Sequence, residues 1–298
     1  MKKLIRNIFI VFLFLQGTVI TACCEVVHIG IASQVIPHAS NDGVLAAIKA
    51  WAQHAVEAKG IQATFEVEIL DSSAEIRNGL DEQRLEIINI PVNDLPYLDM
   101  SLDTVFVSLP AEISFPVRYV LVVHRDSGIT KMSGLKNRRV TISRDNYMQL
   151  ADLWFEASLQ KQGHAASSSF LARITHSENA SRAGLQVFFQ QIDAAVIPKD
   201  AVDKMASLNP QIKKDLLIIE ESEPFMPVIL AVRPSWKSPL RHAMENILVN
   251  LHTTILGKQI LTVFHCLRLE QHPITILEPT LSFLQNNKNV TKSNGGNK

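Results

Sequence analysis

The stretch RYVLVVHRDSGITKMSGLKNRRVTISRDN (residues 118–146) decides the fold of this 298-residue sequence. Two runs rich in β-branched and other apolar residues, 117–124 and 138–142, predict buried strands. The polar segment between them contains glycine and the short basic cluster KNRR (136–139), which is typical of a solvated turn rather than of a nucleic-acid patch. The stretch therefore predicts a strand, a polar connection and a second strand.

The end of this stretch predicts the start of a helix. SRDN (143–146) is a cluster of cap-type residues, and the apolar residues that follow recur at helical spacing, so we expect a helix over 146–162. A helix N-terminus presents unpaired N–H groups and the positive end of the helix dipole, and it can therefore hold an anion. The alternative is that Asp145 or Asn146 simply caps this helix.

Strands and helices alternate along the rest of the chain, which predicts sheets with helices on both faces. The other expected strands lie at 26–32, 64–70, 85–90, 104–109, 169–172, 194–197, 215–219 and 228–232, and the other expected helices at 42–60, 73–80, 178–191 and from about 240 to 284. Segments 82–94 and 189–200 both run from a helix end through an acidic residue into a strand and an Ile-Pro pair. This similarity favours two similarly built lobes. We interpret the two acidic residues, Glu86 and Asp193, as structural residues at strand entries rather than as a catalytic pair.

The N-terminus predicts export. Basic residues precede an unbroken apolar run over 8–15, which is followed by small residues, and this is the pattern of a secretory signal peptide over 1–22. The apolar run is short for a membrane-spanning helix, which needs roughly 20 apolar residues. The alternative is that the segment is retained as a membrane anchor.

The sequence ITAC (20–23) resembles a bacterial lipobox and predicts lipidation of Cys23; the alternative is ordinary cleavage after Ala22. A lipid would hold the protein at a membrane of the cell envelope without a spanning helix. The chain has only three cysteines, Cys23, Cys24 and Cys266, so a disulfide framework and a cysteine-based zinc site are excluded. Cys266 lies in an apolar stretch, where a buried free thiol is favoured over a disulfide with Cys24.

Composition and motifs narrow the function. Hydrophobic residues make up 47% and charged residues 19%, and Lys plus Arg equals Asp plus Glu at 29 each, which indicates a globular protein without a nucleic-acid partner. The sequence has no His-Glu-x-x-His, Gly-x-Ser-x-Gly, P-loop or Gly-x-Gly-x-x-Gly motif. We therefore expect no enzymatic activity, no metal and no cofactor.

The order of these features resembles the phosphate/phosphite/phosphonate-type substrate-binding proteins of ABC transporters, a branch of the type 2 periplasmic-binding fold. Residues 118–146 are similar to that family's hinge strand, turn and following strand. LQVFFQQIDAAVI (185–197) is similar to its helix, small turn, Asp and strand. HIGIA (28–32) and EIINIPVNDLPYL (86–98) are similar to segments of its first lobe, and the resemblance covers most of 26–235.

The resemblance implies a two-lobed α/β fold with mixed, mostly parallel sheets, helices on both faces and a hinge between the lobes. Lobe 1 would comprise 23–116 and 223–285 and lobe 2 would comprise 117–222, with a disordered tail at 286–298. The implied protein is an exported monomer that captures a small anionic solute between its lobes and delivers it to an ABC permease. The alternatives are a ligand-sensing module that signals to a membrane sensor protein and, third, an enzyme on the same fold.

The resemblance also places the ligand between the lobes, near the carboxyl ends of strands. The candidate ligand-binding residues are Ser33, Asn93, Tyr97, Ser143, Arg144, Asn146, Tyr147, His176 and Asn179. Arg144 suits bidentate contact with a carboxylate or phosphate, and Tyr147 suits stacking or hydrogen bonding. Alternative roles are packing for Tyr97 and helix capping for His176 and Asn179. Asp145, and the lack of paired Ser/Thr hydroxyls beside it, depart from the family's anion-binding loop.

Overall fold

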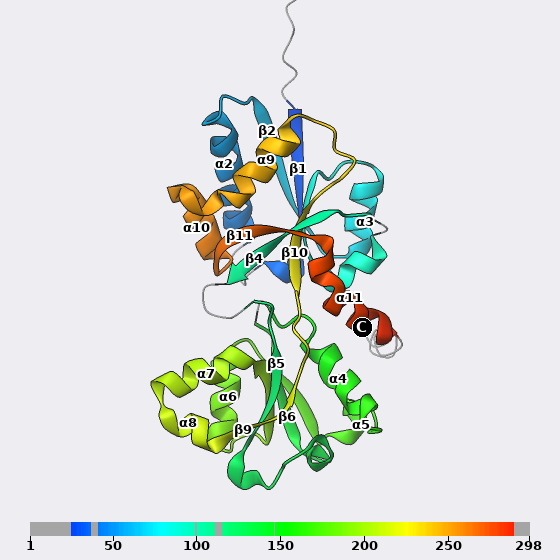
Figure 1. Cartoon of the computed structure of the whole chain (residues 1–298), viewed down its shortest axis with the longest axis vertical. Helices are drawn as coiled ribbons and strands as arrows, with labels where there is room; N and C mark the ends of the chain where they lie inside the picture. Colours follow the sequence, from blue (N-terminus) through cyan, green and yellow to red (C-terminus); the bar gives the residue numbers. More distant parts are fainter. Residues whose placement is uncertain (1–24, 37–40, 99, 111–114, 146, 289–298) are drawn as a thin grey trace, which may run out of the picture.

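The computed structural model of the chain describes residues 25–36, 41–98, 100–110, 115–145 and 147–288. The described chain forms two lobes, each built on a sheet with helices on both of its faces (Figure 1). The lobe 1 sheet has the order β11-β4-β10-β3-β1-β2. Its strands are β1 (Glu25–Ala32), β2 (Ala63–Leu70), β3 (Ile87–Pro91), β4 (Thr104–Pro110), β10 (Val228–Val232) and β11 (Cys266–Pro273).

The helices of lobe 1 lie on both sides of this sheet (Figure 1). One side carries α2 (Asn41–Glu57), α9 (Leu240–Val249) and α10 (Ile255–Val263), and the other carries α3 (Ser73–Asp81) and α11 (Glu278–Asn286). In α2, Ile48, Trp51 and Ala52 recur at helical spacing and are buried against the sheet. Short 3-10 turns follow β1 and β3, namely η1 (Ser33–Val35) and η2 (Val92–Tyr97), and η5 (Leu251–Thr253) precedes α10.

The lobe 2 sheet has the order β7-β6-β8-β5-β9. Its strands are β5 (Tyr119–His124), β6 (Arg139–Ser143), β7 (Arg173–Ser177), β8 (Ala194–Pro198) and β9 (Leu216–Glu221), and the 3-10 turns η3 (Arg125–Ser127) and η4 (Met132–Leu135) lie between β5 and β6. Its helices are α4 (Ala151–Lys161), α5 (Ser167–Phe170), α6 (Ala180–Phe188), α7 (Lys199–Leu208) and α8 (Pro210–Asp215). The helices α6, α7 and α8 lie on one face of the sheet, and α4 and α5 lie on the other (Figure 1).

The two sheets share one topology. In lobe 1, β2-β1-β3 are parallel and are followed by β10, antiparallel to β3, and then by β4. In lobe 2, β7-β6-β8 are parallel and are followed by β5, antiparallel to β8, and then by β9. Segments 82–94 and 189–200, which are similar in sequence, therefore contain the topologically equivalent strands β3 and β8. Both sheets are mixed, but the expected excess of parallel pairing is absent among the described strands.

The acidic residues that precede these equivalent strands have structural roles. Glu86 accepts a hydrogen bond from the backbone N–H of His28 (2.8 Å) and one from Arg233 (2.9 Å). Asp193 accepts hydrogen bonds from the backbone N–H (2.9 Å) and the Nε (3.1 Å) of Arg139. Each carboxylate therefore ties the entry of its strand to a neighbouring strand.

Several expected elements are wrong in position or type. The strand expected at 169–172 begins instead at Arg173, because the preceding serines form α5, where the Glu156 carboxylate accepts hydrogen bonds from the N–H of Ser167 (2.9 and 3.0 Å). The region from about 240 to 284, expected to be helical, contains the edge strand β11. The sequence prediction also lacked α7 and α8.

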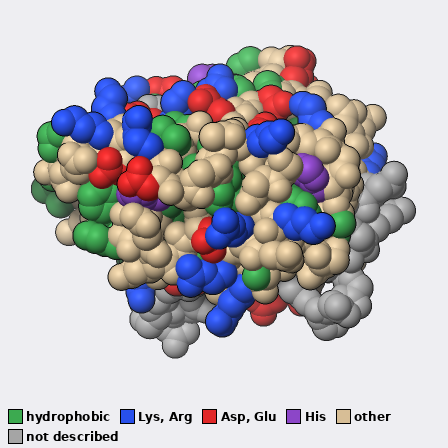
Figure 2. Space-filling model, turned by 90° about the horizontal axis from the view of Figure 1, so that it is seen from below, with side chains coloured by type: hydrophobic (Ala, Val, Ile, Leu, Met, Phe, Trp, Pro, Cys, Tyr) green, Lys and Arg blue, Asp and Glu red, His purple; other side chains and the backbone are tan. Residues whose placement is uncertain are grey.

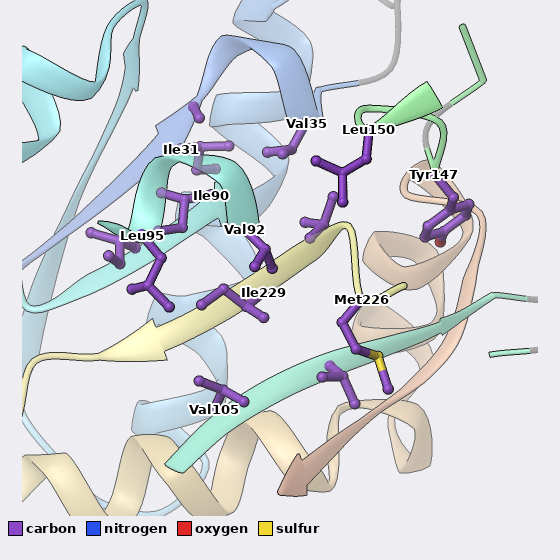
Figure 3. Packing of buried hydrophobic residues seen from close by; sticks show 14 of the residues in the cluster. Ile31, Val35, Ile90, Val92, Leu95, Val105, Tyr147, Leu150, Met226 and Ile229 are labelled. Atoms are coloured by element: carbon purple, nitrogen blue, oxygen red, sulfur yellow. The ribbon is translucent and has the colours of Figure 1, made fainter. Parts of the chain in front are cut away.

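The chain passes between the lobes twice, after β4 and after β9. The two passing segments pair with each other, since the N–H of Val117 donates to the carbonyl of Phe225 (2.9 Å) and the N–H of Phe225 donates back (2.8 Å). Buried hydrophobic residues of both lobes form one cluster. Figure 3 shows Val35 of η1 and Leu150 of lobe 2 among the side chains of this cluster.

The surface shows no large region of a single charge on the face drawn in Figure 2, where basic and acidic side chains are interspersed. Within the described ranges, no helix is both long enough and apolar enough to cross a membrane.

Candidate functional site

The described candidate residues lie at the carboxyl ends of parallel strands or on the loops that follow them. Ser33 follows β1, and Asn93 and Tyr97 lie in η2 after β3; all three belong to lobe 1. In lobe 2, Ser143 ends β6 and Arg144 follows it, while His176 lies in β7 and Asn179 follows that strand. Because the carboxyl ends of parallel strands meet at one edge of a sheet, each lobe brings its own candidates together at one edge.

Asp145 organises the lobe 2 loops. Its Oδ2 accepts hydrogen bonds from the backbone N–H of Ala180 (2.8 Å), the first residue of α6, and from the hydroxyl of Ser143 (3.2 Å). The backbone N–H of Arg144 donates to the carbonyl of Ser177 (2.8 Å), which joins the two loops a second time. Burial raises the pKa of the Asp145 carboxyl, while the hydrogen bonds from Ala180 and Ser143 oppose that rise.

The predicted helix over 146–162 begins later than expected. Helix α4 starts at Ala151, and its N-cap position, Leu150, provides no side-chain hydrogen bond. The segment 147–150 instead forms a turn in which the N–H of Met148 donates to the carbonyl of Asp145 (2.8 Å). Asp145 therefore interacts with the N-terminus of α6 rather than that of α4, and Asn146 lies outside the described residues.

Arg144 and His176 lie side by side at the edge of lobe 2. Nη2 of Arg144 is 3.3 Å from Nε2 of His176, and the same Nε2 is 2.8 Å from Oδ1 of Asp152. One ring nitrogen cannot both donate to a carboxylate and accept from a guanidinium, and the shorter contact identifies Nε2 as the donor to Asp152. Among the described residues, no carboxylate forms an ion pair with Arg144, so its exposed guanidinium is available to an anion.

The remaining lobe 2 candidates have partners within the protein. The hydroxyl of Ser143 is fully buried and bonded to Asp145, and the side chain of Asn179 caps α6 by accepting a hydrogen bond from the N–H of Arg182 (2.8 Å). Tyr147 is buried edge-on against Phe115, with ring centroids 6.2 Å apart. Helix capping was the alternative role expected for Asn179, and the structure shows this residue as the N-cap of α6.

The lobe 1 candidates include two residues in unusual settings. Tyr97 is 56% exposed, which makes it available to a ligand or partner. Oδ1 of Asn93 is buried and has no hydrogen-bond partner among the described residues, while its amide nitrogen is 3.4 Å from Asp94. Burial raises the pKa of the Asp94 carboxyl. Ser33 begins η1 and is half-buried.

The turn between α10 and β11 was not expected from the sequence. Burial raises the pKa of the Tyr147 hydroxyl, as it raises that of the Asp145 carboxyl. His265 has a φ of +51°, a conformation that marks a sharp turn. The segment was expected to be helical, so this turn could not be predicted from local pattern.

Two sheets of the same topology, joined by two paired passing segments and bearing polar loops at their edges, define a two-lobed binding protein of the type 2 periplasmic-binding fold. The periplasmic substrate-binding proteins of phosphonate ABC transporters match residues 34–271 as a family, and the chain belongs to this family. No curated protein sequence matches the chain. The family resemblance and the fold class expected from the sequence are thus confirmed.

Solved structures of similar fold include three bacterial proteins, each 14% identical to this chain. A binding component of a phosphonate ABC transporter from Pseudomonas aeruginosa has a TM-score of 0.55, with 92% of this chain and 90% of that chain covered. A Prochlorococcus marinus protein in complex with methylphosphonate has a TM-score of 0.56, with 88% and 98% covered. A Xanthomonas citri protein bound to ATP has a TM-score of 0.59, with 90% and 98% covered. At this identity the likeness shows the fold alone.

The family gives the protein its class of function. Its members are periplasmic proteins of transport systems, so the chain is a solute-binding protein that serves an ABC transporter, and the export expected from the N-terminus agrees with this location. Cys23 and Cys24 lie outside the described residues, and Cys266 is buried with a free thiol.

Proposed function

We propose that the protein captures a small organic anion between its lobes and that the exposed guanidinium of Arg144 holds the anionic group. The observation that carries this proposal is the arrangement of Arg144 beside His176, where Asp152 engages the imidazole and leaves the guanidinium without a carboxylate partner in the described chain. The solved structures of similar fold include one in complex with methylphosphonate, which supports phosphonates as the first ligands to test.

Native mass spectrometry of gently purified protein, followed by calorimetric titration with methylphosphonate, methanesulfonate and inorganic phosphate, tests this proposal. We expect one anion per chain. A ligand at 100 times its dissociation constant that binds only the folded state should stabilise it by about 2.7 kcal/mol. The absence of both a co-purified anion and any anion-dependent stabilisation would refute the proposal.

Arg144→Ala is expected to weaken anion binding more than tenfold, because a charge-assisted hydrogen bond contributes roughly 1.5–3 kcal/mol. The stability of the unliganded protein should change by less than about 0.5 kcal/mol, because the side chain is exposed. Arg173→Ala is the matched control, since Arg173 is also exposed but lies at the opposite end of β7 from His176. Equal affinities of wild type and Arg144→Ala would remove Arg144 from the site.

We also propose that Cys23 becomes the lipidated N-terminus of the mature protein, because ITAC (20–23) lies four residues after the apolar run (8–15) of the expected signal peptide. Cys23→Ser should move the protein from the membrane fraction to the soluble exported fraction. The check is fractionation combined with mass measurement of the N-terminal peptide. If the variant stays at the membrane and the wild-type peptide carries no acyl mass, Cys23 is not an anchor.

The last part of the proposal concerns the membrane protein with which the ligand-bound protein interacts. We propose delivery to an ABC permease, in keeping with the family, and the alternative is signalling to a membrane sensor protein. Co-purification of the lipidated protein with membrane proteins distinguishes a permease and ATPase from a sensor. Assays of turnover with phosphonate and ester substrates test the third candidate, an enzyme on this fold.

A further inference from the structure

The N-terminus of α6 is already bound to acceptors from the chain itself. Four N–H groups at the start of a helix have no partner within the helix, and such groups can hold an anion. In α6, the carboxylate of Asp145 accepts from the N–H of Ala180 (2.8 Å). The side chain of Asn179 accepts from the N–H of Arg182 (2.8 Å), and the hydroxyl of Ser177 accepts from the N–H of Asn179 (3.4 Å). Three of the four groups therefore have side-chain acceptors.

Asp145 takes the place of an anion at this helix end. Its carboxylate also accepts a hydrogen bond from the hydroxyl of Ser143 (3.2 Å), and its N–H donates back to that hydroxyl oxygen (3.3 Å). Ser143 is fully buried, which fixes the position of the hydroxyl. A hydroxyl and a backbone N–H at a helix N-terminus are donors that suit an anion, and here they bind a carboxylate of the protein. A negative charge is thus built into the loop that contains Arg144.

Carboxylates outnumber guanidinium groups in the two loops of lobe 2. Segments 143–152 and 176–182 together contain three carboxylates, Asp145, Asp152 and Glu178, and two guanidinium groups, Arg144 and Arg182. A solute that binds the guanidinium of Arg144 lies beside the carboxylate of the next residue, Asp145. Each further negative charge on such a solute is repelled by that carboxylate.

We propose that Asp145 sets the charge of the captured solute and selects anions with one negative charge, such as carboxylates and sulfonates, against anions with two, such as a phosphonate dianion. This inference rests on the function proposed above, because the guanidinium of Arg144 holds the solute. The donors that would stabilise a second negative charge, the N–H of Ala180 and the hydroxyl of Ser143, are bound to Asp145. A doubly charged group at Arg144 therefore meets repulsion that no nearby donor offsets.

Calorimetric titration of wild type and Asp145→Asn with methanesulfonate and methylphosphonate tests the proposal. The two anions are similar in shape, and at a pH above the second ionisation of the phosphonate they differ by one charge. The asparagine oxygen can still accept from the N–H of Ala180, while the negative charge is lost. A unit charge a few ångströms from another near a protein surface changes affinity by roughly tenfold, so the variant should gain about that factor more affinity for methylphosphonate than for methanesulfonate.

Glu156→Gln is the matched control. The carboxylate of Glu156 also accepts from an N–H at the start of a helix, that of Ser167 in α5 (2.9 and 3.0 Å). Helix α5 precedes β7, whereas Asp145 follows β6, which is parallel to β7, so the two carboxylates lie at opposite edges of the sheet. The control should leave the ratio of the two affinities unchanged.

The possible results separate charge selection from solute capture. Equal gains for both anions in Asp145→Asn, or the same change of ratio in Glu156→Gln, would overturn the selection by Asp145 and leave solute capture intact. No binding of either anion to wild type or variant would refute both proposals. Binding of the anions by Asp145→Asn alone would show that the carboxylate excludes anions of either charge, and would overturn the assignment of a singly charged solute.

Removal of the Asp145 side chain gives a second measurement that needs no solute. Asp145→Gly leaves the N–H of Ala180 and the hydroxyl of Ser143 without their acceptor, and formate supplies a free carboxylate to replace it. We expect formate to raise the melting temperature of Asp145→Gly in a saturable manner and by more than that of wild type, while neutral formamide has no such effect. Equal effects of formate on the two proteins would show that Asp145 does not replace a bound anion, and would overturn the proposal.

Discussion

Phe225→Ala should lower the free energy of unfolding by about 3–5 kcal/mol, the usual cost of removing a buried aromatic ring. Phe225 is fully buried in the second passing segment, with its ring centroid 5.3 Å from that of Tyr119 and 4.8 Å from that of Phe283. Tyr119 belongs to lobe 2 and Phe283 to α11 of lobe 1, so the ring packs against both lobes. Its loss leaves a cavity where the lobes join.

Denaturant unfolding of wild type and variant measures this loss. Phe189→Ala is the control, because Phe189 is 63% exposed on lobe 2 and its truncation should change stability by no more than about 0.5 kcal/mol. A cost for Phe225→Ala as small as that of the control would show that the junction repacks and that the ring is not needed there. The hydrogen bonds of Phe225 with Val117 involve only the backbone and remain possible in the variant.

Periodicity and strand composition predicted most of the sheets correctly, because buried strands such as β5 and β8 are continuous apolar runs. The errors in the predicted elements arose where tertiary contacts, rather than the local spacing of apolar residues, determine the structure. Apolar residues in 147–150 continue the helical spacing of α4, yet they pack into the interlobe cluster as a turn. Strand β11 alternates charged and apolar residues weakly and is specified by its pairing with β4, which a local pattern cannot reveal.

The candidate site was predicted in part. Cap-type residues at strand ends correctly indicated the loops that follow β6 and β7, because such residues favour turns and helix starts, although His176 itself lies in β7 rather than in a loop. The partner of each residue was not predictable. Asp145 bonds to the N-terminus of α6, which begins 35 residues away, and no local spacing encodes that contact.

Glu86→Ala should lower the free energy of unfolding by about 3–5 kcal/mol, because removing one partner of a buried ion pair leaves the other charge buried. The side chains of Glu86 and Arg233 are 10% and 9% exposed, and their Oε1 and Nη2 atoms are 2.9 Å apart. Arg233 also donates to the carbonyls of Leu85 (2.8 Å) and Gln83 (3.2 Å), so it is held in place when its counter-ion is lost.

The equivalent position of lobe 2 offers a matched comparison. Asp193 precedes β8 as Glu86 precedes β3, but its partner Arg139 has a side chain 51% exposed. Asp193→Ala should therefore cost only about 0.5–1.5 kcal/mol, the usual contribution of a hydrogen bond, since water can solvate the freed groups. Because the two positions share one topology, the difference between the two costs isolates burial as the cause.

A double variant separates the charge from the packing. In Glu86→Leu/Arg233→Met both charges are removed and apolar side chains of similar length replace them, so the variant should regain most of the stability lost by Glu86→Ala. The backbone N–H of His28, which now donates to Glu86, would still lose its acceptor and keep a residual cost of about 1–3 kcal/mol. A double variant no more stable than Glu86→Ala would show that the hydrogen bonds at the entry of β3, rather than the unpaired charge, determine the stability of lobe 1.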